Sequence, residues 1–127
     1  RDNVLPLEGL GLLDLIDSDH TLMPEVRAVA TVGHTPGHLN VVVESEGQSA
    51  AIVGDMLHSS VQVSEPGWCS RADVDAVKAE ASRRGMLEWF ANDRFVVAAG
   101  HFRPDWRYGS VVRQKDRYEW SPLETEV

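Results

Sequence analysis

Short apolar runs, separated by glycine, proline and polar clusters, fill the middle of the chain. The runs are rich in β-branched residues and are bounded by turn formers, a pattern typical of β-strands. They predict one strand over residues 26–32 and a hairpin of strands over 39–46 and 49–54, with its turn at Glu46-Gly47-Gln48. The runs are apolar at both alternations, as expected of strands that are covered on both faces of a sheet.

The flanking segments predict further strands and one long helix. Residues 1–11 mix proline, glycine and apolar positions and indicate a loop. The other strands are expected at 12–16, before a polar turn at 17–20, and at 95–99, 110–114 and 117–120. These elements predict a mixed sheet that is accompanied by a helix.

The helix is predicted over residues 70–94. An apolar stripe at helical spacing runs along it, formed by Val74, Val77, Ala81, Met86, Leu87 and Phe90. Ser70 or Asp73 would cap its start. Arg83 would either pair with an acid such as Asp73 or Asp75 or face solvent. One helix can cover only one face of the sheet, so the other face would need a partner.

Three polar residues stand directly after predicted strands. His34 lies in Gly33-His-Thr-Pro-Gly-His38, Asp55 follows the hairpin, and His101 follows the run that ends at Gly100. Two imidazoles and a carboxylate are ligands that zinc, iron and manganese accept. The alternative is a tight turn that happens to carry two histidines. The repeated placement at strand ends favours a metal site.

Bulk properties narrow the classes of function. A length of 127 residues predicts a single domain spanning 1–127. The net charge of -8 argues against nucleic acid or an anionic membrane as a partner. No apolar run approaches the ~18 residues of a membrane span. Cys69 is the single cysteine and cannot form an internal disulfide, so we expect a reducing compartment, the cytoplasm.

The stretch from Thr31 to Asp55, together with Gly100-His101, resembles the C-terminal half of the metallo-β-lactamase superfamily of metal-dependent hydrolases. Matches to its branch of N-acyl-homoserine-lactone lactonases and methyl-parathion-hydrolase-like enzymes are Asp55-Met-Leu-His58, the Trp68 loop, Ser82-Arg83, Gly100-His101-Phe102 and Tyr118-Glu-Trp120. The resemblance implies an α/β fold built of α and β layers. The chain would be half of an αββα sandwich, with a mixed sheet and one long helix.

The resemblance also implies residue roles. His34, Asp55 and His101 correspond to metal ligands, and Asp55 to the catalytic carboxylate that bridges two metals and holds the attacking water. The implied cofactor is zinc, as one or two ions, with iron or manganese as alternatives. Residues expected around the metals or in the substrate pocket are His38, His58, Trp68 and Phe102.

The primary metal motif of the family, His-x-His-x-Asp-His, is absent, since no two of the five histidines stand two apart. That motif belongs to the N-terminal half, and the chain begins, at Arg1, where the second half begins. We therefore expect a piece of a longer protein, inactive when isolated.

Two functions fit this sequence. The first is a metal-dependent hydrolase of esters, lactones or phosphotriesters, represented by its C-terminal half. The second is a non-catalytic half-fold that self-assembles as a binding or assembly module. Both predict a partner for the open face of the sheet, either a complementing N-terminal half or a second copy in a homodimer. A small-molecule substrate is expected only for the complete enzyme.

Overall fold

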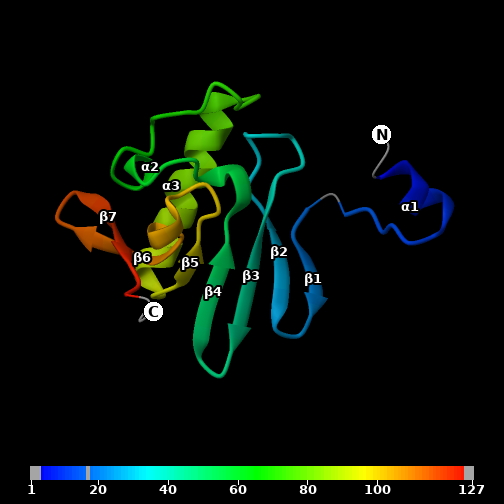
Figure 1. The fold of residues 1–127 in the computed structure, drawn as a ribbon, viewed down its shortest axis with the longest axis horizontal. Coiled ribbons are helices and arrows are strands. Elements are labelled where there is room, and N and C mark those ends of the chain that lie inside the picture. Colours follow the sequence, from blue (N-terminus) through cyan, green and yellow to red (C-terminus); the bar gives the residue numbers. More distant parts are fainter. Residues whose placement is uncertain (1–3, 17, 125–127) are drawn as a thin grey trace.

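A seven-stranded mixed sheet with one long helix forms the body of the molecule (Figure 1). The structure is a computed structural model that describes residues 4–16 and 18–124. The strands are β1 (His20–Met23), β2 (Val26–Ala30), β3 (Leu39–Ser45), β4 (Gln48–Ile52), β5 (Val96–Ala98), β6 (Tyr108–Gln114) and β7 (Arg117–Pro122). The helices are α1 (Leu5–Gly9), α2 (Val61–Ser64) and α3 (Ala76–Asn92), with 3-10 turns η1 (Gly54–Met56) and η2 (Pro104–Trp106). This architecture confirms the predicted α/β class.

The strands lie in the sheet in the order in which they occur in the chain. Neighbouring strands are antiparallel, except that β4 and β5 are parallel and pair Ile52 with Ala98. A parallel pair needs a long crossover connection. Here the crossover runs from Val53 to Phe95 and contains η1, α2 and α3. Within the described residues, no helix has the length and apolar character needed to cross a bilayer.

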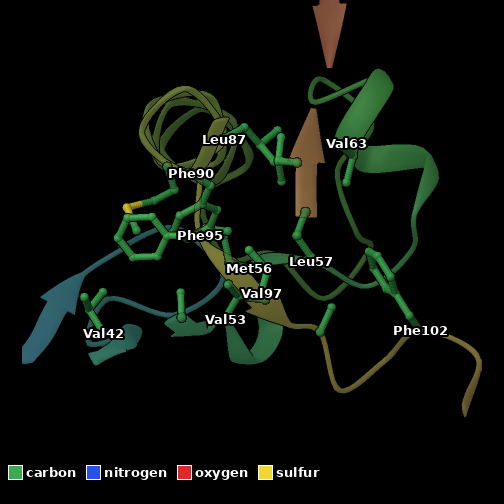
Figure 2. Packing of buried hydrophobic residues seen from close by; sticks show 14 residues of the cluster. Val42, Val53, Met56, Leu57, Val63, Leu87, Phe90, Phe95, Val97 and Phe102 are labelled. Atoms are coloured by element: carbon green, nitrogen blue, oxygen red, sulfur yellow. The ribbon is translucent and has the colours of Figure 1, made fainter. Parts of the chain in front are cut away.

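The hydrophobic core lies between α3 and one face of the sheet (Figure 2). Its buried members are Val42, Ala51, Val53, Met56, Leu57, Val63, Met86, Leu87, Phe90, Phe95, Val97, Ala99, Phe102 and Val111. Val42 pairs with Ala51, and Ala51 with Val97, so one face of three strands supplies a continuous apolar row. Phe90 of α3 packs on this row, and its ring lies 5.1 Å from that of Phe95.

The opposite face of the sheet is apolar too, and within the described residues it is the less buried of the two. The side chains that alternate with the core row are Val26, Ala28, Ala30, Leu39, Val41, Val43, Ala50, Ile52, Val96 and Ala98. Ile52 is 55% exposed and Val96 40% exposed. The apolar residues at both alternations are therefore present as predicted, but within the described residues part of the second face stays exposed. We call this second surface the open face.

The N-terminal segment differs from its prediction. Residues 12–16 form no strand, and the first strand begins instead at His20, which pairs with Ala28 of β2. Asp17 of the predicted turn lies outside the described residues. Leu5–Gly9, predicted as loop, forms α1, which stands away from the sheet (Figure 1). Local apolar pattern does not make a strand where no neighbouring strand offers backbone partners.

The long helix starts later than predicted. It begins at Ala76, and Asp75 caps it by accepting a hydrogen bond from the Lys78 N–H at 3.0 Å. The prediction that the apolar stripe is buried is wrong for its first half, because Val77 is 79% exposed. The buried face instead runs through Arg83, which pattern analysis does not count as a core residue.

Candidate metal centre

The strands that precede the three predicted ligands point in the same direction. β2 and β4 are both antiparallel to β3, and β4 is parallel to β5. The C-terminal ends of β2, β4 and β5 therefore meet at one edge of the sheet, where ligand sites of α/β proteins are commonly found. His34, Asp55 and His101 follow these ends, so the topology brings together residues that lie far apart in the sequence.

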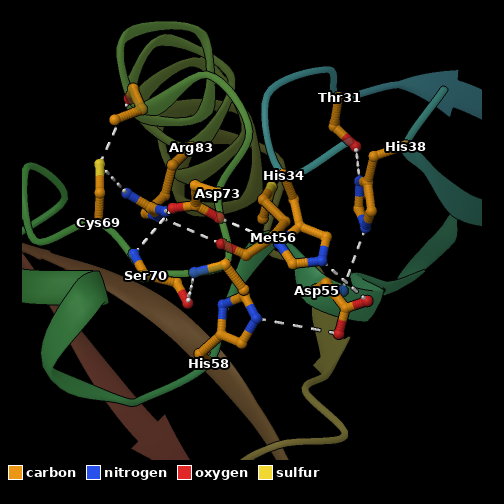
Figure 3. A network of polar contacts seen from close by, with 12 residues as sticks. Thr31, His34, His38, Asp55, Met56, His58, Cys69, Ser70, Asp73 and Arg83 are labelled. Carbon is orange, nitrogen blue, oxygen red and sulfur yellow. Dashed lines mark hydrogen bonds and ion pairs between the residues drawn. The ribbon is translucent and has the colours of Figure 1, made fainter. Parts of the chain in front are cut away.

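The carboxylate of Asp55 is the centre of the resulting cluster (Figure 3). Its Oδ2 lies 3.5 Å from Nε2 of His34, while its Oδ1 contacts Nε2 of His101. The same Oδ1 lies 4.0 Å from Nε2 of His58. The potential ligand atoms of Asp55, His58 and His101 are within 4.8 Å of one another, and so are those of His34, His58 and Asp73.

The loop that carries His34 is hydrogen-bonded to the residues that precede α3. Gly33 adopts a φ of 137°, and its carbonyl accepts a hydrogen bond from the Asp75 N–H at 2.9 Å. The His34 carbonyl accepts another from the Val74 N–H at 3.1 Å. The Nδ1 of the His34 ring lies 3.0 Å from Oδ1 of Asp73, which leaves Nε2 on the side of Asp55.

His38 supports the site without facing it. The Asp55 N–H donates to Nε2 of His38 at 3.1 Å, so that nitrogen carries no proton. Nδ1 then donates to Oγ1 of Thr31 at 2.8 Å, and this hydroxyl donates to Oδ1 of Asn40. Burial lowers the pKa of His38, which keeps the ring neutral. Both ring nitrogens are thus occupied, Nε2 by the backbone N–H of Asp55 and Nδ1 by the hydroxyl of Thr31.

His58 lies between the two predicted histidine ligands. Its ring stacks on that of His101 at 4.9 Å and lies 5.0 Å from that of His34. Burial, together with the neighbouring His101, lowers the pKa of His58. Its Nδ1 is buried and, among the described residues, has no hydrogen-bond partner. His58 is therefore a neutral imidazole whose Nε2 faces the cluster.

The donor set fits a divalent transition metal. A hydrogen bond from His101 holds the pKa of Asp55 below its ordinary value, so Asp55 is a carboxylate at neutral pH. Its side chain is 44% exposed and can be reached from solvent. One carboxylate beside several imidazoles is the ligand chemistry of zinc, iron and manganese.

Trp68 and Phe102, also expected around the site, differ in burial, and Asp73 joins the site from outside the predicted set. Trp68 is exposed, and Phe102 is buried in the core, edge-on to Trp120 at 4.9 Å. Asp73, expected from the sequence only as a helix cap or an ion-pair partner of Arg83, does pair with Arg83 and also contacts His34. The signal was the pair of carboxylates just before the helix, because a helix start needs only one of them as a cap.

Comparison with known proteins supports this description. The family model of the metallo-beta-lactamase superfamily matches residues 4–101. The solved structure of the hydrolase AbOPH in the beta lactamase superfamily superposes with a TM-score of 0.82 at 26% identity, covering 98% of this chain and 43% of that one. No curated protein sequence matches significantly.

Two further structures share the fold. AidC, a dizinc quorum-quenching lactonase, gives a TM-score of 0.82 at 22% identity, covering 99% of this chain and 47% of that one. A probable metal-dependent hydrolase from Staphylococcus aureus gives 0.77 at 18% identity, covering 93% and 42%. The chain thus spans less than half the length of each of these structures.

Proposed function

The chain belongs to the metallo-β-lactamase superfamily, and from this premise we propose that it carries the C-terminal part of the metal centre of a metal-dependent hydrolase. The observation that carries the proposal is the convergence of His34, Asp55 and His101 at three parallel strand ends, with the Asp55 carboxylate between the two imidazoles. The residues that would hold the metal are these three. Zinc is the proposed ion, with iron or manganese as alternatives.

Asp55 has the geometry of a shared ligand. One carboxylate oxygen faces His34 and the other faces His101, so the two imidazoles lie on different sides of the group. A divalent metal bound there would supply Lewis acidity and would acidify a water molecule. The role of Asp55 in the reaction would be to hold that water by accepting its hydrogen bond, and to take up a proton at a carboxylate oxygen.

The proposed substrates are small molecules with an ester, lactone or phosphotriester group. The exposure of Asp55 and His101 supports this class, because the reacting centre of a substrate must approach the carboxylate from solvent. A lactonase and other hydrolases among the structural neighbours support it as well. The activity would belong to a complete enzyme, since the chain lacks the His-x-His-x-Asp-His motif.

We expect zinc binding to depend on the three ligands together. Isothermal titration calorimetry should show zinc binding to the wild type, and binding weaker by more than about 10-fold in His34→Ala and in His101→Ala, because each removes one of few ligands. His20→Ala is the matched control, since His20 is an exposed histidine on β1. Equal affinities of His34→Ala and the wild type would remove His34 from the site.

The open face implies a partner, and we propose either the complementing half of the fold or a second copy of the chain. Each would cover apolar side chains such as Ile52 and Val96. Burial of apolar surface stabilises an assembly by about 25 cal/mol per Å² removed from water. One face covering its own copy through a two-fold axis is the simplest arrangement for the isolated chain. If zinc binding fails while self-association is found, the alternative function of an assembly module is favoured.

We expect the isolated chain to self-associate at micromolar concentration. Light scattering should give a mass above the 14.1 kDa of one chain. Ile52→Lys should shift the distribution towards monomer, because it places a charge in the open face. Val77→Lys is the matched control, since Val77 is an exposed apolar residue on α3. A wild type that remains a single 14.1 kDa species would contradict the proposal.

A further inference from the structure

A buried ion pair lies directly behind His34 (Figure 3). The side chain of Asp73 is fully buried and that of Arg83 is 1% exposed, with 3.7 Å between Oδ2 of Asp73 and a terminal guanidinium nitrogen. We propose that Asp73 and Arg83 are positioning residues that fix the tautomer and orientation of His34 and tie it to the segment that carries Asp55. The proposal deepens the proposed function, on which its metal-binding consequence rests.

The contacts of Asp73 determine which nitrogen of His34 carries the proton. Oδ1 of Asp73 lies 3.0 Å from Nδ1 of His34, and Oδ2 accepts a hydrogen bond from the Ser70 N–H at 2.8 Å. A carboxylate only accepts, and Nδ1 lies closer to Asp73 (3.0 Å) than Nε2 lies to Asp55 (3.5 Å), so these contacts place the proton of a neutral His34 ring on Nδ1. The lone pair is then on Nε2, the atom that faces Asp55. Metal-binding histidines commonly have such a carboxylate on the other ring nitrogen.

Arg83 connects this carboxylate to the other side of the site. Its Nε donates to the carbonyl of Met56 at 3.1 Å, and a terminal nitrogen donates to the carbonyl of Pro66. Met56 follows Asp55 directly in η1. The Arg83 guanidinium thus contacts Met56, which is the neighbour of Asp55 in the chain. The same group contacts Asp73, which in turn contacts His34. The planar group, with several donors in fixed directions, is suited to holding these oxygens at once.

A purely structural ion pair is the alternative explanation. Removing either partner of a buried pair leaves an uncompensated charge and destabilises a protein whatever else the pair does. Loss of stability therefore does not discriminate between the two explanations. The tautomer of His34 does, because a pair that only stabilises the fold would leave the imidazole proton where it is.

The test uses the full chain labelled with ¹⁵N, without metal, at a pH at which the imidazoles are neutral. Long-range ¹H–¹⁵N spectra distinguish Nδ1–H from Nε2–H for each histidine. We expect His34 as Nδ1–H in the wild type, and a shift towards the Nε2–H form, which free imidazoles favour, in Asp73→Ala. His38 should keep Nδ1–H in both proteins, which confirms that the site is still folded. Asp75→Asn is the matched control, since it removes a neighbouring carboxylate that does not contact His34.

The wild-type spectrum already tests the proposal if Asp73→Ala does not fold, because His34 found as Nε2–H would overturn it. An unchanged His34 tautomer in folded Asp73→Ala would overturn it as well. Zinc titration adds a second readout, with affinity expected to fall about 10- to 100-fold in Asp73→Ala and to be unchanged in Asp75→Asn. A chain that binds no zinc but shows the tautomer shift would contradict the proposed function and leave the positioning role intact.

Discussion

We expect the isolated chain to hydrolyse lactones, aryl esters and phosphotriesters no faster than the uncatalysed background, with or without added zinc. The reason is the missing His-x-His-x-Asp-His motif, because without it only the proposed ligands His34, Asp55 and His101 would hold a metal. Hydrolysis at a two-metal site depends on clamping both the attacking and the leaving oxygen. A centre with one set of ligands cannot hold both.

The measurement is steady-state turnover of the chain alone, and then of the chain mixed with a polypeptide that carries the missing half. Chelator-sensitive turnover of the chain alone near ~10 per second, an ordinary enzyme rate, would contradict the expectation. If the mixture gains activity, Asp55→Asn should abolish it, because the shared carboxylate is then lost. His20→Asn should leave it unchanged, since His20 lies on β1, outside the cluster.

Gly33→Ala should strongly destabilise the fold. Gly33 has a φ of 137°, and a Cβ added there would lie 2.1 Å from the backbone N of Ala79 and 2.3 Å from its Cα. Both are backbone atoms of α3, which cannot turn aside as a flexible side chain can. The strain and the overlap together should cost about 3 kcal/mol or more in the free energy of unfolding. The whole free energy of unfolding of a small domain is only about 5–15 kcal/mol.

Gly37→Ala is the matched control for this prediction. Gly37 belongs to the same loop, but a Cβ added there would meet nothing within 4 Å. Urea denaturation should therefore show a large drop in midpoint for Gly33→Ala and little change for Gly37→Ala. Similar midpoints for the two variants would show that the loop is not packed on α3 as the structure has it.

Much of the sheet, and the position of three polar residues at strand ends, could be predicted from the sequence. Short β-branched runs between turn formers indicate strands. The residue that follows such a run must lie at the end of that strand, so its position in the sheet is known. That is why His34, Asp55 and His101 could be grouped before any geometry was known. The common direction of β2, β4 and β5 then brings them together.

The misses share a physical cause, which is that tertiary contacts overrode local pattern. The apolar residues Val74 and Val77 lie outside the core, whereas Arg83 lies inside it, because its guanidinium finds carbonyl and carboxylate oxygens there. Hydropathy periodicity carries no information about such partners. The loss of the strand at 12–16 has the same origin, since a strand exists only where another strand pairs with it.

The crossover between β4 and β5 has a consequence for the kinetics of folding. The other neighbouring strands of the described chain are joined by short antiparallel connections, which close quickly because little chain entropy is lost. The parallel pair of β4 and β5 can form only after the connection from Val53 to Phe95 has folded back across the sheet, so it should form late. Asp55 lies just inside the start of this segment and His101 just beyond its end. The cluster of His34, Asp55 and His101 should therefore be completed only in the last cooperative step, so partly folded chains would lack the proposed metal centre.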